Sequence, residues 1–422
     1  MKNAVLFFTL LSMVVVLFSC NENKDIDNGN NGTLPEPIRL VLPESEIRMT
    51  KSGSIAAMNL FSIINSLQEE DENVVLSPLS LHMALAMVWN GANGETKEAI
   101  QQTLCLSDFS PEEVNAYFKK LRETFVKTDP TVQLALANSI WYRLGFSVKS
   151  GFIQTNKTYY DAEVSEIDFS NTQTPEIINQ WCSDHTNGRI KEMIETIPTD
   201  AAMYLLNALY FKGTWANEHG FSKPATSDER FTKADGSQTT VKMMQQNNTL
   251  PYYKDEYLTL TALPYGNNAF SMLFILPNSG VSFDALATRF KQEGYWEQCL
   301  ASRETYDVDL YIPRFKIEYD ITLNEALMQS GMGIAFTTSA DFSGISDTPL
   351  CISKVKQKTY IEVNEEGTEA AAVTAIEMKF TSVGPPPEPK KVTFRADRPF
   401  LFAIQENSTG TILFMGKIGN PL

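Results

Sequence analysis

Residues 73–100 read NVVLSPLSLHMALAMVWNGANGETKEAI and join a short apolar strand to a helix that is apolar on all sides. The apolar residues 74–76 predict the strand. Ser77 and Pro78 predict the start of the helix, because proline fits the first helical turn, where its missing N–H is not needed. A helix without a polar face has to be buried. The stretch therefore predicts a core helix that ends at the segment Gly91–Gly94.

The rest of the chain has the composition of a globular protein, with 422 residues, 43% of them hydrophobic and 20% charged. Helical patterns come early and apolar strands come late. The last two strands, at 400–404 and 411–415, are joined by a turn at 407–410. These patterns predict an α+β fold. The formal net charge of −16 disfavours nucleic acid as a partner, because an acidic chain repels phosphate groups.

The first fifty residues predict export and a lipid anchor. Residues 1–19 place a lysine before an apolar run of signal-peptide length, too short to span a membrane. The run ends at Cys20, in a sequence that resembles the lipobox of bacterial lipoproteins. An ordinary signal peptide followed by a chance cysteine is the alternative. Residues 21–32 contain one apolar residue in twelve, so residues 20–50 are expected to form a flexible lipidated tether. The pattern of residues 52–68 predicts an amphipathic helix.

From these segments we expect an exported protein that is lipid-anchored to the cell envelope, at the outer membrane or the cell surface. Its only contact with a membrane should be the lipid on Cys20.

Sequence motifs of enzymes are missing from the chain. It has no G-x-S-x-G, H-E-x-x-H or G-x-x-x-x-G-K-[ST] sequence. His82 lies in the apolar helix and should be a packed core residue, whereas His185 and His219 lie in polar segments. Cysteines other than Cys20 are widely spaced, which predicts isolated thiols rather than disulfides or a zinc site: Cys105, Cys182, Cys299 and Cys351. We expect no enzymatic activity, no cofactor and no metal.

Long blocks of the sequence resemble the serpin family, in the family's order. Residues 73–100 resemble its second and third helices with the strand that feeds them. Further blocks are LALANSIWY (134–142), INQWCSDHTNGRIKEMI (178–194), LLNALYFKGTW (205–215), FSMLFILP (270–277), VDLYIPRFKIEYDITLNEALMQSGMGIAF (308–336) and FRADRPFLFAIQENSTGTILFMGKIGNP (394–421). The resemblance implies a single serpin domain over residues 51–422. It also implies three β-sheets, eight to nine helices and an exposed reactive-centre loop at about 365–390.

The resemblance further implies inhibition of serine endopeptidases as a suicide substrate. A protease cuts the loop and is trapped as an acyl-enzyme while the cut loop inserts into the central sheet. The family pattern places the scissile bond at Thr381–Ser382, with Lys379 and Phe380 as secondary cleavage sites. Thr381 suits elastase-like proteases first. Lys379 and Phe380 suit trypsin-, chymotrypsin- or subtilisin-like proteases, and papain-like cysteine proteases are a further class. The inhibitor should be a monomer.

The stretch EEGTEAAAVTAI, residues 365–376, occupies the position of the family's hinge. Its alanines alone suggest a short helix equally well. Insertion as a strand also explains the alternation of residue types along this stretch, because alternate side chains of a strand face opposite sides of a sheet. The side that carries Thr368 holds only small uncharged residues as far as Thr374. The hinge residues implied are Glu365, Gly367, Thr368, Glu369, Ala370, Ala371, Ala372 and Thr374.

A second group should control the opening of the central sheet. By resemblance it contains Ser77, Ser80, Asn207, Trp215 and Gln357, and the family often has a histidine where this chain has Gln357. Ordinary core packing is the alternative for these residues. The alternative for the whole chain is a non-inhibitory serpin that acts as a surface binding or scaffold module.

Overall fold

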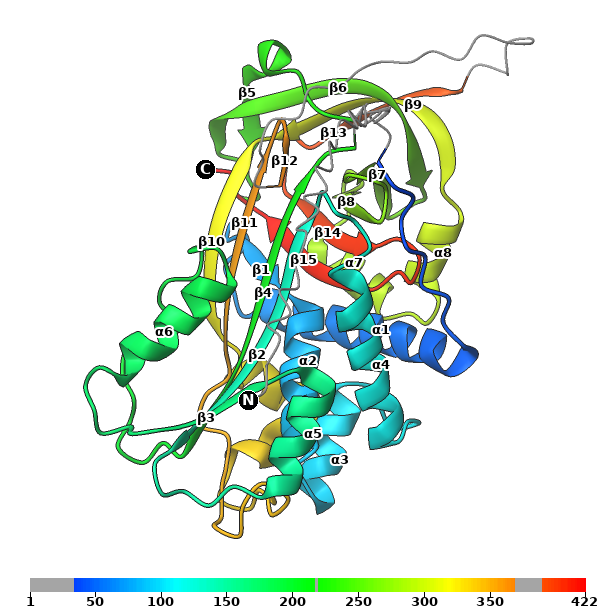
Figure 1. The fold of residues 1–422 in the computed structure, drawn as a ribbon. Coiled ribbons are helices and arrows are strands. Elements are labelled where there is room, and N and C mark those ends of the chain that lie inside the picture. The colour runs from blue at the N-terminus through cyan, green and yellow to red at the C-terminus, as the bar shows by residue number, and fades with distance from the viewer. Residues whose placement is uncertain (1–33, 217–218, 369–388) are drawn as a thin grey trace, which may run out of the picture. The chain divides into compact units, whose positions relative to one another are not determined.

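In the computed structural model of the protein, the described residues are 34–216, 219–368 and 389–422. They form two β-sheets with helices between and around them (Figure 1). Cys20 and the residues predicted to be cleaved, 379–382, lie outside the described ranges.

The six-stranded sheet has the order β10-β11-β12-β4-β2-β3. Its strands are β10 (Phe315–Thr322), β11 (Lys356–Asn364), β12 (Gly367–Thr368), β4 (Met203–Thr214), β2 (Gln133–Arg143) and β3 (Glu163–Ile167). Neighbouring strands are antiparallel except β2 and β3, which are parallel. Figure 1 shows α6 (Thr174–His185) on one face of this sheet and α2 (Pro78–Trp89) on the other.

The nine-stranded sheet has the order β1-β15-β14-β8-β7-β6-β9-β13, with β5 paired to β6. Its strands are β1 (Val74–Leu76), β15 (Ile412–Ile418), β14 (Phe400–Glu406), β8 (Phe270–Pro277), β7 (Leu258–Pro264), β6 (Gln238–Lys254), β9 (Glu304–Pro313), β13 (Lys391–Arg395) and β5 (Ser227–Thr232). The long strand β6 pairs with β5 at its beginning and with β7 at its end. The resemblance implies three sheets, but in the described ranges β6 joins two groups of strands into one nine-stranded sheet.

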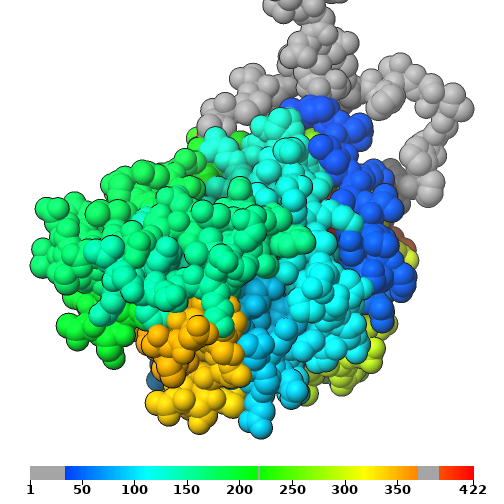
Figure 2. Space-filling view, turned by 60° about the horizontal axis from the view of Figure 1, so that its bottom comes forward, coloured from blue at the N-terminus to red at the C-terminus, as the bar shows by residue number. Residues whose placement is uncertain are grey.

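The helices in the described ranges are α1 (Glu44–Ser66), α2, α3 (Gly94–Thr103), α4 (Pro111–Phe125), α5 (Ser150–Tyr160), α6, α7 (Phe283–Phe290), α8 (Tyr295–Ala301) and α9 (Asn324–Leu327). Shorter helical turns are η1 (Lys223–Ala225), η2 (Met328–Met332) and η3 (Gly333–Phe336). The predicted α+β class is confirmed. Figure 2 shows residues 323–355 (yellow to orange) against α2 and α3 (light blue).

Helix α2 lies between the two sheets, in contact with β4 and β15. Met83, Ala86 and Trp89 have no exposed surface, as expected for a helix without a polar face. At the end of α2 the chain turns sharply, and a Cβ atom on Gly91 would lie only 2.2 Å from Ile345 Cγ1. Gly91 therefore lets residues 341–346 close over the end of the helix. The predicted helix boundaries are confirmed here.

The N-terminal boundary of the domain is earlier than predicted. Helix α1 begins at Glu44, not near residue 52, and residues 34–43 lie against the domain. The carbonyl oxygen of Ile38 accepts a hydrogen bond of 2.7 Å from Thr128 Oγ1, and that of Pro35 accepts one of 3.0 Å from Asn267 Nδ2. The prediction of a flexible tether as far as residue 50 is therefore wrong at its C-terminal end. Polar partners far along the chain satisfy this backbone, and they cannot be found from local composition.

None of the helices in the described ranges is long and apolar enough to cross a membrane.

Candidate functional site

Strand β12 lies between β11 and β4, at one end of the six-stranded sheet. Thr368 is opposite Val363 on β11 and Gly213 on β4. The Thr368 side chain faces the core, where it is 2% exposed and shares a hydrogen bond with Tyr265 Oη. In the described ranges, β12 is the only strand that pairs with both β4 and β11, and it does so over two residues. This end of the sheet, where β12 separates β4 from β11, is called the entrance below.

Gly367 makes the close approach of β12 to β4 possible. Its φ angle of 153° lies in a region that favours glycine, and a Cβ atom there would be 2.1 Å from the carbonyl oxygen of Gly213. A side chain at this position would push β12 away from β4. The resemblance places Gly367 in the hinge, and the structure supplies a steric reason for a glycine at this position.

Trp215 holds the chain that leads into β12. Its indole Nε1 donates to the carbonyl oxygen of Asn364 at 3.0 Å, and its backbone N–H donates to that of Glu366 at 3.0 Å. The indole ring also stacks on Tyr265, with the ring centres 4.6 Å apart. The stacked side chains of Trp215 and Tyr265 thus support the turn at Glu365–Glu366, which leads into β12.

Glu365 is a buried carboxylate at this entrance, with 2% of its side chain exposed. Arg314 Nη2 and Thr226 Oγ1 both donate to its Oε1, at 2.5 and 2.8 Å. Burial by itself would raise the pKa of Glu365, but the hydrogen bonds from Arg314 and Thr226 outweigh it, so that this pKa lies below its usual value. Glu365 thus makes polar contacts to two segments that are distant from it in the sequence. Its partner Arg314 connects β9 to β10.

Gln357 fastens β11 to the start of α2. Its Oε1 accepts from the backbone N–H of Ser77 at 2.8 Å, and its Nε2 donates to the carbonyl oxygen of Ser77 at 3.0 Å. Ser77 Oγ donates to the carbonyl oxygen of Leu413 on β15 at 2.8 Å. The side-chain amide of Gln357 thus bonds to both the N–H and the carbonyl oxygen of Ser77, because glutamine carries both a donor and an acceptor.

Asn207 fastens β4 to the same helix. Its Oδ1 accepts from Ser80 Oγ on α2, and its Nδ2 donates to Asn138 Oδ1 on β2 at 2.5 Å. Asn138 Nδ2 in turn donates to the carbonyl oxygen of Tyr160 at 2.7 Å. The structure therefore brings together the four residues Ser77, Ser80, Asn207 and Gln357, whereas Trp215 lies at the entrance with Glu365.

Some expected hinge residues cannot be placed. Glu369, Ala370, Ala371, Ala372 and Thr374 lie outside the described residues.

Four side chains of the site were not singled out from the sequence, namely those of Asn138, Thr226, Tyr265 and Arg314. Arg314 and Glu365 are 51 residues apart, and Tyr265 and Thr368 are 103 apart, so no local pattern pairs them. Asn138 lies inside a sequence block that was recognised only as a strand. A buried polar residue in the middle of an apolar strand was the available signal, because such a group needs a partner.

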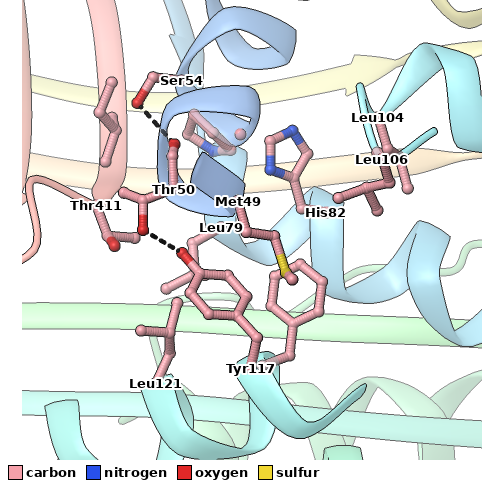
Figure 3. A pocket seen from close by; sticks show the side chains of 14 residues that line it. Met49, Thr50, Ser54, Leu79, His82, Leu104, Leu106, Tyr117, Leu121 and Thr411 are labelled. Carbon is pink, nitrogen blue, oxygen red and sulfur yellow. Dashed lines mark hydrogen bonds between the residues drawn. The ribbon is translucent and has the colours of Figure 1, made fainter. Parts of the chain in front are cut away.

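His82 is buried in α2, as expected of a core residue. Its desolvation lowers the pKa of the imidazole to about 4. Figure 3 shows the ring among Met49, Leu104 and Leu106. His185 lies on α6, where its Nδ1 is 2.8 Å from the carbonyl oxygen of Trp181.

The four described cysteines are free thiols, with Cys182 and Cys299 buried and Cys351 exposed. Burial raises the pKa of Cys182 to about 12. Within the described part of the chain, no three His, Cys, Asp or Glu side chains lie together as metal ligands would.

Glu365→Gln should lower the free energy of unfolding by about 2 kcal/mol, because it weakens two hydrogen bonds to a buried charge. The matched control is Glu366→Gln, one residue along. Its side chain is 30% exposed and pairs with Lys223, which is 66% exposed, so the loss should stay below about 1 kcal/mol. Urea denaturation measures both variants. Equal losses would contradict the assigned role of the Glu365–Arg314 pair.

The stability of the protein should fall as the pH falls from 6.5 to 4, in part because of His82. The unfolded state binds a proton at His82 over this range and the folded state does not, so folding loses up to about 3 kcal/mol. His82→Gln removes this component, and its stability should depend less on pH over the same interval. His185→Gln is the control. Identical pH profiles for wild type and His82→Gln, from urea denaturation, would refute the prediction.

Comparison with known proteins agrees with this architecture. The family profile described as "Serpin (serine protease inhibitor)" matches residues 54–421. An uncharacterized serpin-like protein of Methanosarcina mazei is 32% identical over 418 residues, which are 98% of this chain and 97% of the relative. The native state of the thermophilic serpin tengpin has 33% identity and a TM-score of 0.79, and the match covers 92% of this chain and 97% of tengpin.

Human thyroxine-binding globulin complexed with thyroxine has 28% identity and a TM-score of 0.79, over 89% of this chain and 99% of the globulin. The similarity to these three proteins covers between 89% and 98% of this chain. The chain therefore belongs to the serpin family.

Proposed function

We propose that the protein inhibits serine endopeptidases as a suicide substrate. The observation that carries the proposal is the position of β12, a two-residue strand between β4 and β11. The chain that follows β12 contains the predicted bond Thr381–Ser382. After cleavage of that bond, a strand that grows from β12 gains hydrogen bonds to both neighbours, which is the physical basis of strand addition.

The register of β12 makes this proposal specific. Each further residue of a growing strand pairs with one residue earlier on β4 and on β11. Counting from Thr368, opposite Gly213 and Val363, residue 374 comes opposite Asn207 and Gln357. Thr374 thus enters between the two amides that fasten β4 and β11 to α2. Its hydroxyl can both donate and accept, so it suits this position.

The target protease supplies the chemistry. Its serine oxygen attacks the carbonyl carbon of Thr381, the amine of Ser382 leaves, and an ester joins the two proteins. Insertion of the freed segment before water reaches the ester pulls the protease against the inhibitor and distorts its oxyanion hole. Loss of that stabilisation alone slows a protease by about 10²–10³. The ester therefore persists. The uncut protein is held in its native state by a kinetic barrier.

We also propose that the inhibitor is a monomer, exported and lipidated at Cys20. Metabolic labelling with a radioactive fatty acid tests the lipid, which Cys20→Ala should abolish. Label retained in that variant would exclude lipidation at this cysteine.

Incubation with elastase-, trypsin-, chymotrypsin-, subtilisin- and papain-like proteases should give a complex that survives denaturant with at least one of them. Mass spectrometry of the released C-terminal peptide should find Ser382 as its first residue, and elastase-like proteases should react fastest, because Thr381 is small. A released peptide that begins at Phe380 or Thr381 would assign the secondary bonds. Cleavage without any covalent complex would refute inhibition by this mechanism.

Two neighbouring substitutions test insertion directly. Ala370→Arg places a charge on the core side, opposite Phe211 and Ile361, and should turn the inhibitor into a substrate. Glu369→Arg is the control, because the opposite side of the strand already carries a charge there. Its stoichiometry of inhibition should rise less than twofold, whereas that of Ala370→Arg should rise at least tenfold. Similar values for the two variants would contradict insertion in this register.

The alternative function is a binding module without inhibitory activity, and the similarity to thyroxine-binding globulin favours it. The melting temperature before and after cleavage of the loop separates the two functions. An inhibitor should gain at least 20 °C when the cut loop inserts, because the sheet gains a strand. An unchanged melting temperature would favour the binding module.

A further inference from the structure

Two cavities meet at His82. One has a volume of about 30 Å³ and lies between α1, α2 and α4 (Figure 3). The other has a volume of about 210 Å³ and lies between α1, α2, the end of α3 and η2. The second cavity opens to solvent at Gln102 and Lys291, both exposed.

The imidazole of His82 has no polar partner in the described ranges, although 91% of the residue is buried. The backbone of Gly53 lies against it, since a Cβ atom built there would be 3.6 Å from His82 Nδ1. The two imidazole nitrogens keep some accessible surface where they line these cavities. A polar group in the interior is nearly always hydrogen-bonded, so His82 has a free position for a hydrogen bond to a small molecule in the cavity. A neutral imidazole carries one donor and one acceptor, and a hydroxyl group satisfies either.

The larger cavity has the size for a small aromatic molecule, and its lining is partly apolar and partly polar. A cavity of about 150 Å³ holds benzene, so 210 Å³ holds a benzene ring with small substituents. Leu60, Leu81, Leu85 and Leu327 are buried and supply apolar walls. Lys291 at the opening supplies a positive charge.

We propose that this cavity binds a small phenol that carries a carboxylate. The ring lies among the leucines, the hydroxyl group bonds to His82, and the carboxylate faces Lys291. This site is separate from the entrance at β12, and the proposal does not depend on inhibition of proteases.

Nuclear magnetic resonance of the histidine side chains tests the proposal with 4-hydroxyphenylacetate as the probe. The chain has three histidines, so His185 and His219 are internal controls. In the full-length protein labelled at histidine, the His82 signal, assigned by its loss in His82→Phe, should shift and saturate with a dissociation constant of about 1 mM. No saturable shift of that signal up to 20 mM would overturn the proposal.

Three matched comparisons test the two polar contacts. Phenylacetate, which lacks the hydroxyl group, should bind wild type about tenfold more weakly than the probe. Lys291→Gln should weaken the probe but leave 4-methylphenol unchanged. His82→Phe keeps an aromatic ring in place, so thermal unfolding can verify its fold, and calorimetry should find no difference between the probe and phenylacetate in that variant. Equal binding of both compounds to wild type would refute the bond to His82.

Discussion

Two amide side chains, Gln357 and Asn207, fasten two strands of the six-stranded sheet, β11 and β4, to one end of α2. Gln357 holds β11 through both backbone groups of Ser77, and Asn207 holds β4 through Ser80. Gln357, Ser77 and Ser80 are buried and Asn207 is half-buried, so most of their polar atoms have to find partners within the protein. The separation of β4 and β11 is consequently tied to a helix that is itself locked between two sheets. A strand that enters between them has to pass this point.

The entrance above that point is built from different interactions. The buried carboxylate of Glu365 is held by the partly exposed side chains of Arg314 and Thr226, and the stacked pair Trp215–Tyr265 supports the turn into β12. Gly367 allows β12 to lie close to β4, and the side chain of Thr368 faces the core. Charge and aromatic stacking thus hold the entrance, whereas amide hydrogen bonds hold the middle of the sheet. The two groups can be weakened separately by substitution.

Sequence patterns predicted features that depend on neighbours along the chain. The boundaries of α2 follow from Ser77, Pro78 and the apolar residues after them, and the side of Thr368 follows from the alternation of a strand. The partners of Glu365 and the continuity of β6 across two groups of strands could not be predicted, because they depend on contacts between distant segments. The same reason explains why residues 34–43 were expected to be free: their partners Thr128 and Asn267 come much later in the chain.

Amide hydrogen exchange before and after cleavage of the loop tests most directly whether the six-stranded sheet accepts a new strand. Residues 369–378 should exchange far more slowly after cleavage than before it, because inserted amides bond to β4 or β11. Protection should also rise along the facing edges of those strands. Equally fast exchange of residues 369–378 before and after cleavage would contradict insertion.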